Sequence, residues 1–331
     1  MKNSPLYYSV GALLYCPANN ETFANSIINE KFGTCFSLAL CLEDTIADAY
    51  VLEAEEMLYQ SIRTIYEQTS IRKFFLPKLF IRVRNPEQML RIQKRLSHAM
   101  SIITGFIVPK FSLETADTYI QTIIQVNERS IRPIYMMPIY ESPSLIPLRS
   151  RYDLLYSLKD KLSQIEELVL NIRVGGNDLC HVFGFRRHVS ESIHSIKPIS
   201  QIFSDIITVY GLDYVISGPV WEYFNGPGWD TGLANEIAED RLCGFSGKTV
   251  IHPKQIAIVN EAYKVEEKDF ISAKKILNWD SSSHSLVAAD SSKERMEEVK
   301  THTNWAEKTL HLAKCYGVKS NSNHCHNEKC S

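Results

Sequence analysis

The sequence lacks any apolar run close to the length that a membrane-spanning helix needs, which is about 18 residues, and we predict no membrane association for its 331 residues. It also lacks an excess of positive charge. Its 36 Lys and Arg residues face 38 Asp and Glu residues, a formal net charge of −2. Because duplex nucleic acid and anionic membranes attract basic surfaces, this balance argues against a nucleic-acid partner.

Regular cysteine spacing is absent as well. The eight cysteines include several within apolar runs, where a free thiol behaves as a small hydrophobic side chain. The amino-terminal stretch carries one Lys before apolar residues, but tyrosines and Ser9 interrupt it, so it makes a poor signal peptide. Both features favour a cytoplasmic protein.

What the sequence does contain is a repeated alternation of strand and helix patterns. Short apolar or β-branched runs end in polar or turn residues eight times, at residues 11–18, 35–44, 78–84, 105–110, 131–141, 167–178, 213–220 and 248–253. Helical periodicity separates them. For example, Asn85 and Pro86 provide a cap and a first-turn proline for a helix that starts there.

Near-continuous apolar strands that alternate with helices predict a parallel sheet buried on both faces. Eight units in about 250 residues match a closed (β/α)8 barrel, so the predicted fold class is α/β, a TIM barrel with a C-terminal helical extension. The competing fold is an open doubly wound sheet. That fold favours a glycine-rich phosphate loop after the first strand, and "CPANN" contains no such motif.

The domain organisation follows from composition. We expect a catalytic barrel over residues 1–278, a linker loop and C-terminal helix over 279–316, and a disordered tail over 317–331, because the linker is rich in Ser and Asp and the tail is polar. The tail could bind a metal through His324, Cys325, His326 and Cys330. Their spacing matches no standard zinc pattern, so we expect a solvated tail.

In a barrel of this kind, catalytic groups project from the carboxyl ends of the strands. Reading those ends gives Asn19, Asn20, Glu43, Asp44, Arg82, Arg84, Lys110, Glu141, Asp178, Ser217 and His252. Any chain turns polar where a strand reaches solvent, so no single residue in this set is decisive. Together, however, they indicate a site that binds or transfers charge.

Glu141 and Asp178 end neighbouring predicted strands, so their carboxylates should approach one another. Two carboxylates that leave positions open for water and substrate are a common way to hold Mg²⁺. The alternative is turn formation, for which Gly175, Gly176, Asn177 and Asp178 are a suitable composition. Spacing alone does not decide between the two, and our preference for the metal site rests on the family resemblance described next.

Seven motifs in order carry a family resemblance over about residues 10–278. They are "LLYCPAN", "LCLEDTI", "FIRVRNP", "IVPK", "PIYES", "VGGNDL" and "GFSGKTVIHPKQI". With them the chain resembles the citrate lyase beta-subunit and 2-oxo acid aldolase superfamily of (β/α)8 carbon–carbon lyases. It looks closest to the C–C bond lyase branch associated with tellurium-resistance-type gene clusters.

The resemblance implies roles for the strand-end residues. Glu141 and Asp178 correspond to Mg²⁺ ligands, Arg82 to the substrate arginine, and Glu43 with Asp44 to a catalytic polar network beneath the substrate. It implies a small 2-oxo or hydroxy acid as substrate. The charge of the enolate formed on cleavage would fall on the metal and the guanidinium. Further substrate-binding candidates are Arg84, Lys110, Arg186, Arg187 and His252.

Departures from the family pattern keep other functions open. Gly11 and Ala12 replace an Arg-Ser pair, which we interpret as the loss of a group that would bind coenzyme A phosphates. Cys41 and Ser246 replace two family aspartates, so the general base cannot be assigned. The alternatives are a coenzyme A thioester lyase or Claisen-type synthase, and a non-catalytic barrel that serves as a binding or assembly subunit. The intact Arg82, Glu141 and Asp178 argue against the last.

The predicted C-terminal helix is more apolar than an isolated helix should be. Its apolar side chains are Met296, Val299, Trp305, Leu310, Leu312 and Ala313. Such a helix must cover a surface, either on its own barrel or on a neighbour. Since relatives in this family form trimers or hexamers, the resemblance implies a homo-oligomer in which this helix packs over a neighbouring site.

Overall fold

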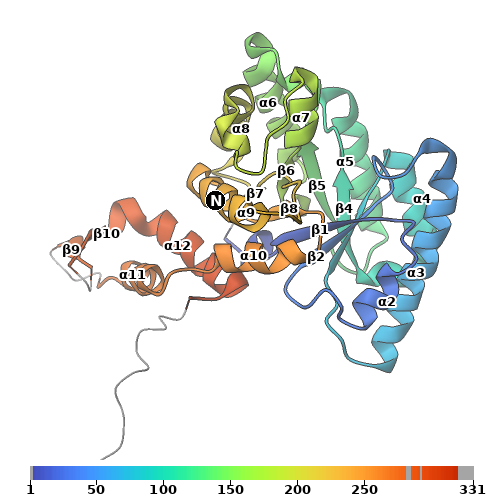
Figure 1. The fold of residues 1–331 in the computed structure, drawn as a ribbon, viewed down its shortest axis with the longest axis horizontal. Helices are drawn as coiled ribbons and strands as arrows, with labels where there is room; N and C mark the ends of the chain where they lie inside the picture. Colours follow the sequence, from blue (N-terminus) through green and yellow to red (C-terminus); the bar gives the residue numbers. More distant parts are fainter. Residues whose placement is uncertain (1–2, 281–284, 291–292, 320–331) are drawn as a thin grey trace, which may run out of the picture.

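The fold is that of a computed structural model, which describes residues 3–280, 285–290 and 293–319. Eight parallel strands form one sheet in the order β7-β6-β5-β4-β3-β2-β1-β8 (Figure 1). Their bounds are β1 Ala12–Pro17, β2 Ser37–Cys41, β3 Lys78–Arg82, β4 Ile103–Val108, β5 Tyr135–Tyr140, β6 Ile172–Val174, β7 Ile216–Ser217 and β8 Lys248–Val250.

The sheet closes on itself between β7 and β8. An isolated parallel bridge joins Gly218 to Lys248, and the Ser246 backbone N–H donates to the Ile216 carbonyl at 2.7 Å. Seven of the predicted runs contain an observed strand that is shorter than the run, whereas β4 begins two residues before its predicted run, 105–110, and ends two residues earlier. The predicted (β/α)8 barrel is therefore confirmed.

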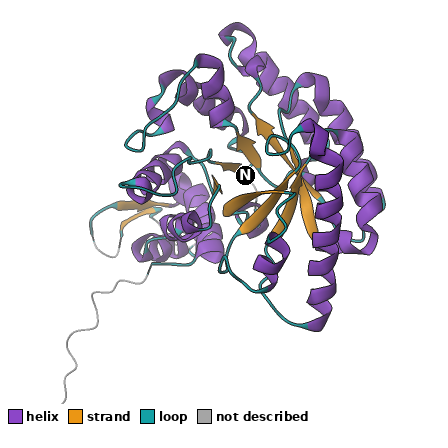
Figure 2. Cartoon of the chain, turned by 45° about the vertical axis from the view of Figure 1, so that its right-hand side comes forward, coloured by secondary structure: helices purple, strands orange, loops and turns teal. Residues whose placement is uncertain are grey.

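Helices surround the strands on the outside of the barrel (Figure 2). Asn85 caps α4 as expected, because its side chain accepts a hydrogen bond from the Gln88 N–H at 2.9 Å.

Among the described residues, no helix has the length and apolar content needed to cross a bilayer. The helices are α1 Pro5–Tyr8, α2 Phe23–Ile28, α3 Val51–Ile71, α4 Pro86–Leu96, α5 Leu113–Glu128, α6 Leu148–Ser163, α7 Gly176–Phe183, α8 Lys197–Tyr210, α9 Trp229–Cys243, α10 Lys254–Tyr263, α11 Glu267–Leu277 and α12 Val299–Tyr316.

Two apolar cores follow from strands that are buried on both faces. The larger core lies between the strands and the outer helices, and includes Leu14, Leu40 and Ile81. The smaller core takes the alternate positions of the same strands, such as Leu13, Ala39 and Phe80, together with Tyr7 and Tyr8 of α1. The barrel interior is therefore filled, and α1 lies at the amino-terminal end of its strands.

The sixth strand is shorter than predicted. β6 stops at Val174, and Asp178 is the third residue of α7 rather than the end of a strand. The Gly175-Gly176 pair ends the strand and starts the helix at once. Asp178 in the first helical turn faces the positive end of the helix dipole, which stabilises its carboxylate without full burial.

The segment expected as a linker loop is partly ordered. β9 (Val287–Ala289) and β10 (Met296–Glu298) pair as an antiparallel hairpin, with Met296 opposite Ala289. Figure 1 shows this hairpin with α11 and α12 as a lobe beside the barrel. The possible metal ligands of the tail, His324, Cys325, His326 and Cys330, lie outside the described residues.

The helix α12 packs on its own barrel, at the amino-terminal end of the strands. The Tyr316 hydroxyl donates to the Tyr8 carbonyl at 3.2 Å, the His311 ring stacks on the Tyr8 ring at 5.3 Å, and Leu312 packs against the inner core. This contact accounts for much of the apolar surface of the helix, although Trp305 remains 36% exposed. The homo-oligomer, and a helix over a neighbour's site, stay predictions.

We expect a chain that ends at Asn278 to lose stability, because truncation uncovers Tyr8 and the inner core beneath α12. Exposing several apolar side chains should lower the free energy of unfolding by about 3 kcal/mol or more. Urea unfolding measures this loss, and a chain that ends at Lys319 is the matched control. Equal unfolding midpoints for the two chains would show that α12 does not stabilise the barrel.

Candidate active site

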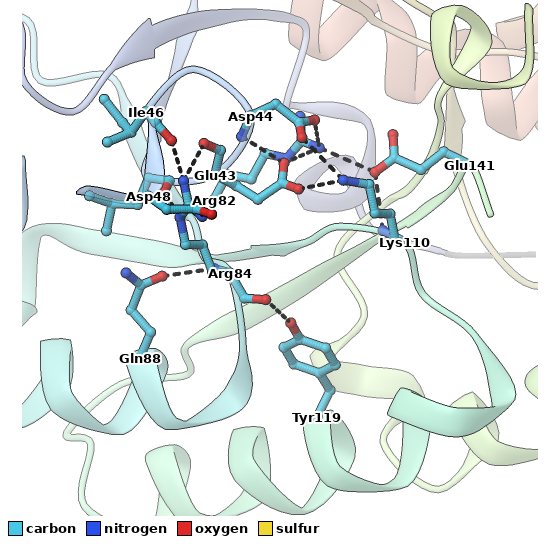
Figure 3. A network of polar contacts seen from close by, with 11 residues as sticks. Glu43, Asp44, Ile46, Asp48, Arg82, Arg84, Gln88, Lys110, Tyr119 and Glu141 are labelled. Atoms are coloured by element: carbon cyan, nitrogen blue, oxygen red, sulfur yellow. Dashed lines mark hydrogen bonds and ion pairs between the residues drawn. The ribbon is translucent and has the colours of Figure 1, made fainter. Parts of the chain in front are cut away.

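The carboxyl ends of four adjacent strands bring a cluster of charged side chains together. β2 leads into Glu43 and Asp44, β3 ends in Arg82, β4 leads into Lys110 and β5 leads into Glu141. Figure 3 shows these side chains turned toward one another over the strand ends. Parallel strands place their carboxyl ends at one end of a barrel, so the topology alone assembles the cluster.

Arg82 lies at the centre of the cluster. Its Nη2 contacts Glu43 Oε2 at 2.6 Å, Asp44 Oδ2 at 2.8 Å and Glu141 Oε1 at 3.2 Å. All three ion pairs use the same nitrogen. The Nε–H is buried and has no hydrogen-bond partner in the described part of the chain. A buried donor without a partner is uncommon and points to an acceptor that binds there.

Lys110 closes the cluster from β4. Its Nζ contacts Glu43 Oε1 at 2.7 Å and Asp44 Oδ1 at 3.1 Å, and its backbone N–H donates to Glu141 Oε1 at 3.1 Å. Its φ is 49°, a left-handed conformation that a lysine rarely adopts. Partial burial lowers the pKa of the Lys110 ammonium, but Glu43 and Asp44 outweigh that effect and raise it. Lys110 is therefore a fixed cation.

Glu141 and Asp178 are the two carboxylates expected to hold a metal. Glu141 is only 3% exposed, and burial raises its pKa to about 8, with a further contribution from the charge of Asp178. Arg82 opposes this rise without cancelling it. Asp178, half-buried in α7, forms no hydrogen bond or ion pair with the described residues. Both groups therefore present carboxylate oxygens that protein donors do not saturate.

The charges of the cluster fit a divalent cation. Four carboxylates, from Glu43, Asp44, Glu141 and Asp178, outnumber the two cations Arg82 and Lys110 and leave a formal charge of −2. In the described ranges, no three His, Cys, Asp or Glu side chains converge as a metal-binding group. An ion here would take its oxygen ligands from Glu141 and Asp178 and the rest from water or substrate, as Mg²⁺ does.

Glu43 and Asp44 are neighbours with different proton affinities. Burial raises the pKa of the Glu43 carboxyl more than Arg82 lowers it. Burial also acts to raise the pKa of Asp44, but its contacts with Glu43, Arg82 and Lys110 lower it overall. Two adjacent carboxyls whose pKa values diverge are able to divide acid and base roles. Glu43 is the more basic of the two.

The predicted substrate contact Arg84 has another set of partners. Its Nε donates to the Leu42 carbonyl at 2.7 Å, and its guanidinium also contacts the carbonyls of Glu43 and Ile46 and the Asp48 carboxylate. These contacts hold the loop that follows β2 (Figure 3). Arg84 therefore stabilises the loop that carries Glu43 and Asp44. Its guanidinium contacts this loop, and these contacts give it a structural role rather than a role in binding substrate.

Arg187 and Arg186 are not part of the charged cluster. Arg187 is buried: it donates to the Val220 carbonyl, and its Nε lies 3.2 Å from Glu236 Oε2. The same Glu236 also pairs with the buried Lys248 at 2.9 Å, so Arg187 belongs to a structural network between α9 and β8. Arg186 is exposed and lies 3.7 Å from Glu222.

His252 follows β8 at the same end of the barrel. Its ring stacks on the Phe224 ring at 4.8 Å, and its Nδ1 accepts a hydrogen bond from the Lys254 N–H at 3.2 Å. Burial and the charge of Lys254 lower its pKa. A neutral, half-buried imidazole in this position could contact a substrate, so the binding role of His252 stays a prediction.

Sequence reasoning missed the role of Gly175. A Cβ atom built on it would lie 2.3 Å from both Cβ and Oε2 of Glu141, and real atoms do not approach so closely. Its φ of −96° is open to any residue, so space is what requires glycine. The "VGG" motif was the only sequence feature that could have indicated this role. By itself it predicts a turn, and only the fold shows that Glu141 lies against Gly175.

We expect Gly175→Ala to lower any metal affinity and activity of the site by about 10- to 100-fold, as displacement of a metal-supporting group does. The added methyl must push the Glu141 carboxylate aside, while the backbone conformation is allowed. Calorimetric Mg²⁺ titration and urea unfolding together test this. Asn177→Ala, two positions further along, is the control, and equal Mg²⁺ affinities in the two variants would refute the steric argument.

The position of Gly11 and Ala12 in the fold contradicts the interpretation of this pair as a lost coenzyme A contact. Gly11 and Ala12 stand at the amino-terminal end of β1, where a Cβ on Gly11 would lie 3.6 Å from the Tyr316 ring of α12. The charged cluster is at the opposite end of the same strands. The missing Arg-Ser pair therefore says nothing about coenzyme A phosphates near the site, and the argument drawn from it against a thioester was wrong.

A closed parallel barrel with a buried charged cluster at its carboxyl end has the architecture of a TIM-barrel enzyme. The chain belongs to the C–C bond lyase family of the TIM-barrel fold, whose model matches residues 4–318. Family membership makes it a carbon–carbon lyase. No curated protein matches it in sequence.

Solved structures share the fold. The CitE protein of Mycobacterium tuberculosis, solved with magnesium, acetoacetate and coenzyme A, is 18% identical, with a TM-score of 0.59 over 93% of this chain and 100% of that chain. A citrate lyase from Burkholderia xenovorans is 13% identical, with a TM-score of 0.69 over 95% of this chain and 94% of that one. RipC from Yersinia pestis is 15% identical, with a TM-score of 0.52 over 77% of this chain and 95% of that one.

Proposed function

We propose that the protein is a Mg²⁺-dependent lyase or aldolase that cleaves a carbon–carbon bond in a small 2-oxo or hydroxy acid. Two features carry this proposal. Glu141 and Asp178 are two carboxylates that nearby cations do not fully neutralise, and the buried Nε–H of Arg82 has no hydrogen-bond partner among the residues that the structure describes. A cation and an anionic substrate would satisfy both groups at once. The M. tuberculosis structures that contain magnesium with pyruvate or oxaloacetate support this ligand class.

In this proposal Arg82 and the metal ligands divide the binding of substrate. The free Nε–H of Arg82 donates to the substrate carboxylate, while Glu43, Asp44 and Glu141 hold its Nη2 and fix the plane of the guanidinium. A bound Mg²⁺ would polarise the carbonyl of the substrate and offset negative charge that develops there. Glu141 and Asp178 would hold it.

The bond that breaks lies one carbon removed from the carbonyl. Its electron pair passes toward the carbonyl as an enolate, and the other fragment leaves as a carbonyl compound after its hydroxyl loses a proton. The enolate then takes up a proton to give the product acid. Glu43, the more basic of the adjacent pair, is the side chain we assign to proton transfer, and Lys110 keeps it in place at 2.7 Å.

A substrate screen tests the proposal. Purified protein with Mg²⁺ is incubated with 2-oxo acids, 4-hydroxy-2-oxo acids and coenzyme A thioesters, and release of pyruvate, oxaloacetate or acetyl-coenzyme A is followed. We expect release from at least one acid that lacks coenzyme A, and its loss on addition of a chelator. Activity on thioesters alone would favour the synthase or thioester-lyase alternative.

A further inference from the structure

A second cavity lies at the opposite end of the barrel from the charged cluster. Its volume is about 580 Å³, and it is bounded by α3, the end of α4 and the segment that follows α5. These elements lead into the starts of β3, β4 and β5, so the cavity opens at the amino-terminal end of the strands. This volume is within the range of cavities that bind small molecules.

The lining of this cavity is basic. Lys94, His98, Arg129 and Arg132 line it together with the hydroxyls of Ser97, Ser101 and Ser130, and no acidic residue does. Within the described ranges, none of the four forms an ion pair. The neighbouring Arg95, by contrast, pairs with Glu56 at 2.5 Å.

Arg132 is the most constrained of the four. One Nη2–H donates to the Ile103 carbonyl at 3.0 Å, which anchors the guanidinium at the start of β4. Partial burial lowers its pKa, and no carboxylate counteracts that effect. Arg132 is nevertheless exposed, so its remaining donors, which have no counter-ion within the described residues, are accessible to an anionic ligand.

The cavity also has an apolar side. Tyr66, Met100 and Ile134 line it, and Ile131 at the rim is fully exposed at 104% relative accessibility. Basic side chains at the ends of α4 and α5 do complement the helix dipoles. Interaction with the helix dipoles explains the basic side chains. It does not explain the cavity, the serine hydroxyls that line it or the exposed Ile131 at its rim.

We propose that this cavity binds a mononucleotide or a similar phosphorylated molecule with a flat apolar group. Arg129, Lys94 and Arg132 would contact the phosphate, and the apolar side, with Tyr66 and Ile131, would contact the ring. Arginine binds phosphate with two donors in a fixed geometry, and three cations around one cavity suit the larger charge of a phosphate better than that of a simple carboxylate. The position, at the far end of the barrel, makes this a binding site separate from the proposed lyase site.

Isothermal titration calorimetry with AMP, in buffer without Mg²⁺, tests the proposal. We expect saturable binding with a dissociation constant below about 1 mM, competition by inorganic phosphate, and much weaker binding of adenosine. The variant Lys94→Glu/Arg129→Glu should weaken AMP binding at least 10-fold, because each reversal adds repulsion at the phosphate. Both side chains are exposed, so the barrel should keep its stability in urea.

The matched control is Lys31→Glu/Lys300→Glu, which makes the same charge change at two exposed residues outside the cavity. Its α12 member lies on the other side of the molecule from α4 (Figure 1). The proposal is overturned if wild-type protein binds no AMP, if adenosine binds as well as AMP, or if the control weakens AMP binding as much as the cavity variant. Tighter binding of a single-stranded oligonucleotide than of AMP would also overturn it.

Discussion

Glu141→Gln should abolish Mg²⁺ binding and lower the cleavage rate by on the order of 10³-fold, the scale on which removal of one preorganised charge acts. Glu141 is buried at 3% exposure and would join Asp178 as an oxygen ligand in the proposed site, while its Oε1 accepts from Arg82 and Lys110. Glutamine keeps the shape but has no charge. With Asp178 as the only carboxylate left at the ion, the site would no longer match a divalent cation.

Asp178→Asn should have a similar effect on Mg²⁺ binding with less effect on stability, because Asp178 is half-buried and is not one of the three carboxylates that pair with Arg82. Calorimetric titration with Mg²⁺ and the cleavage assay measure both losses. Glu53→Gln and Asp153→Asn, two exposed acids, are the matched controls. If either site variant binds Mg²⁺ like its control, the metal is not held by this pair.

Arg82→Lys should lower activity by about 10²- to 10³-fold, although the charge is conserved. One guanidinium nitrogen holds three carboxylates at 2.6, 2.8 and 3.2 Å and leaves the Nε–H for substrate. An ammonium is a point charge on a flexible stem, so it cannot both hold Glu43 and Glu141 and present a second donor in a fixed plane. The loss should appear in kcat and in KM.

The control for this change is Arg95→Lys, which alters an exposed ion pair with Glu56 and should be nearly neutral. Urea unfolding separates a local effect from a global one, since three carboxylates around a smaller cation also reduce stability. An Arg82→Lys enzyme within a few-fold of wild type would mean that Arg82 is structural and that another group binds the substrate carboxylate.

The barrel could be predicted from local patterns. Buried parallel strands read as near-continuous apolar runs, and eight of them alternate with helical segments that start at signals such as Asn85 and Pro86. The cluster of Glu43, Arg82, Lys110 and Glu141 was equally accessible, because polar residues at the ends of parallel strands must meet at one end of a barrel. Both depend only on position along a strand.

Contacts between distant segments could not be predicted in this way. Arg84 and Arg187 resemble substrate ligands in sequence. In the fold, Arg84 donates to carbonyls of the loop after β2, while Arg187 donates to the Val220 carbonyl and pairs with Glu236 of α9. Gly11 looked like a lost phosphate contact, and only the fold shows it at the opposite end of β1, against Tyr316. A sequence records which donor is present, whereas the packing of other segments decides which acceptor reaches it.

The sequence by itself determined the strand count, the alternation with helices and the order of charged strand ends, since these follow from the two-residue period of strands and the 3.6-residue period of helices. Tertiary structure alone decided three further features. It set Glu141 against Gly175 without room for a methyl group, turned α12 back onto its own barrel, and gathered Lys94, Arg129 and Arg132 around one cavity. Each depends on distances between segments far apart in the chain, and no local pattern encodes such a distance.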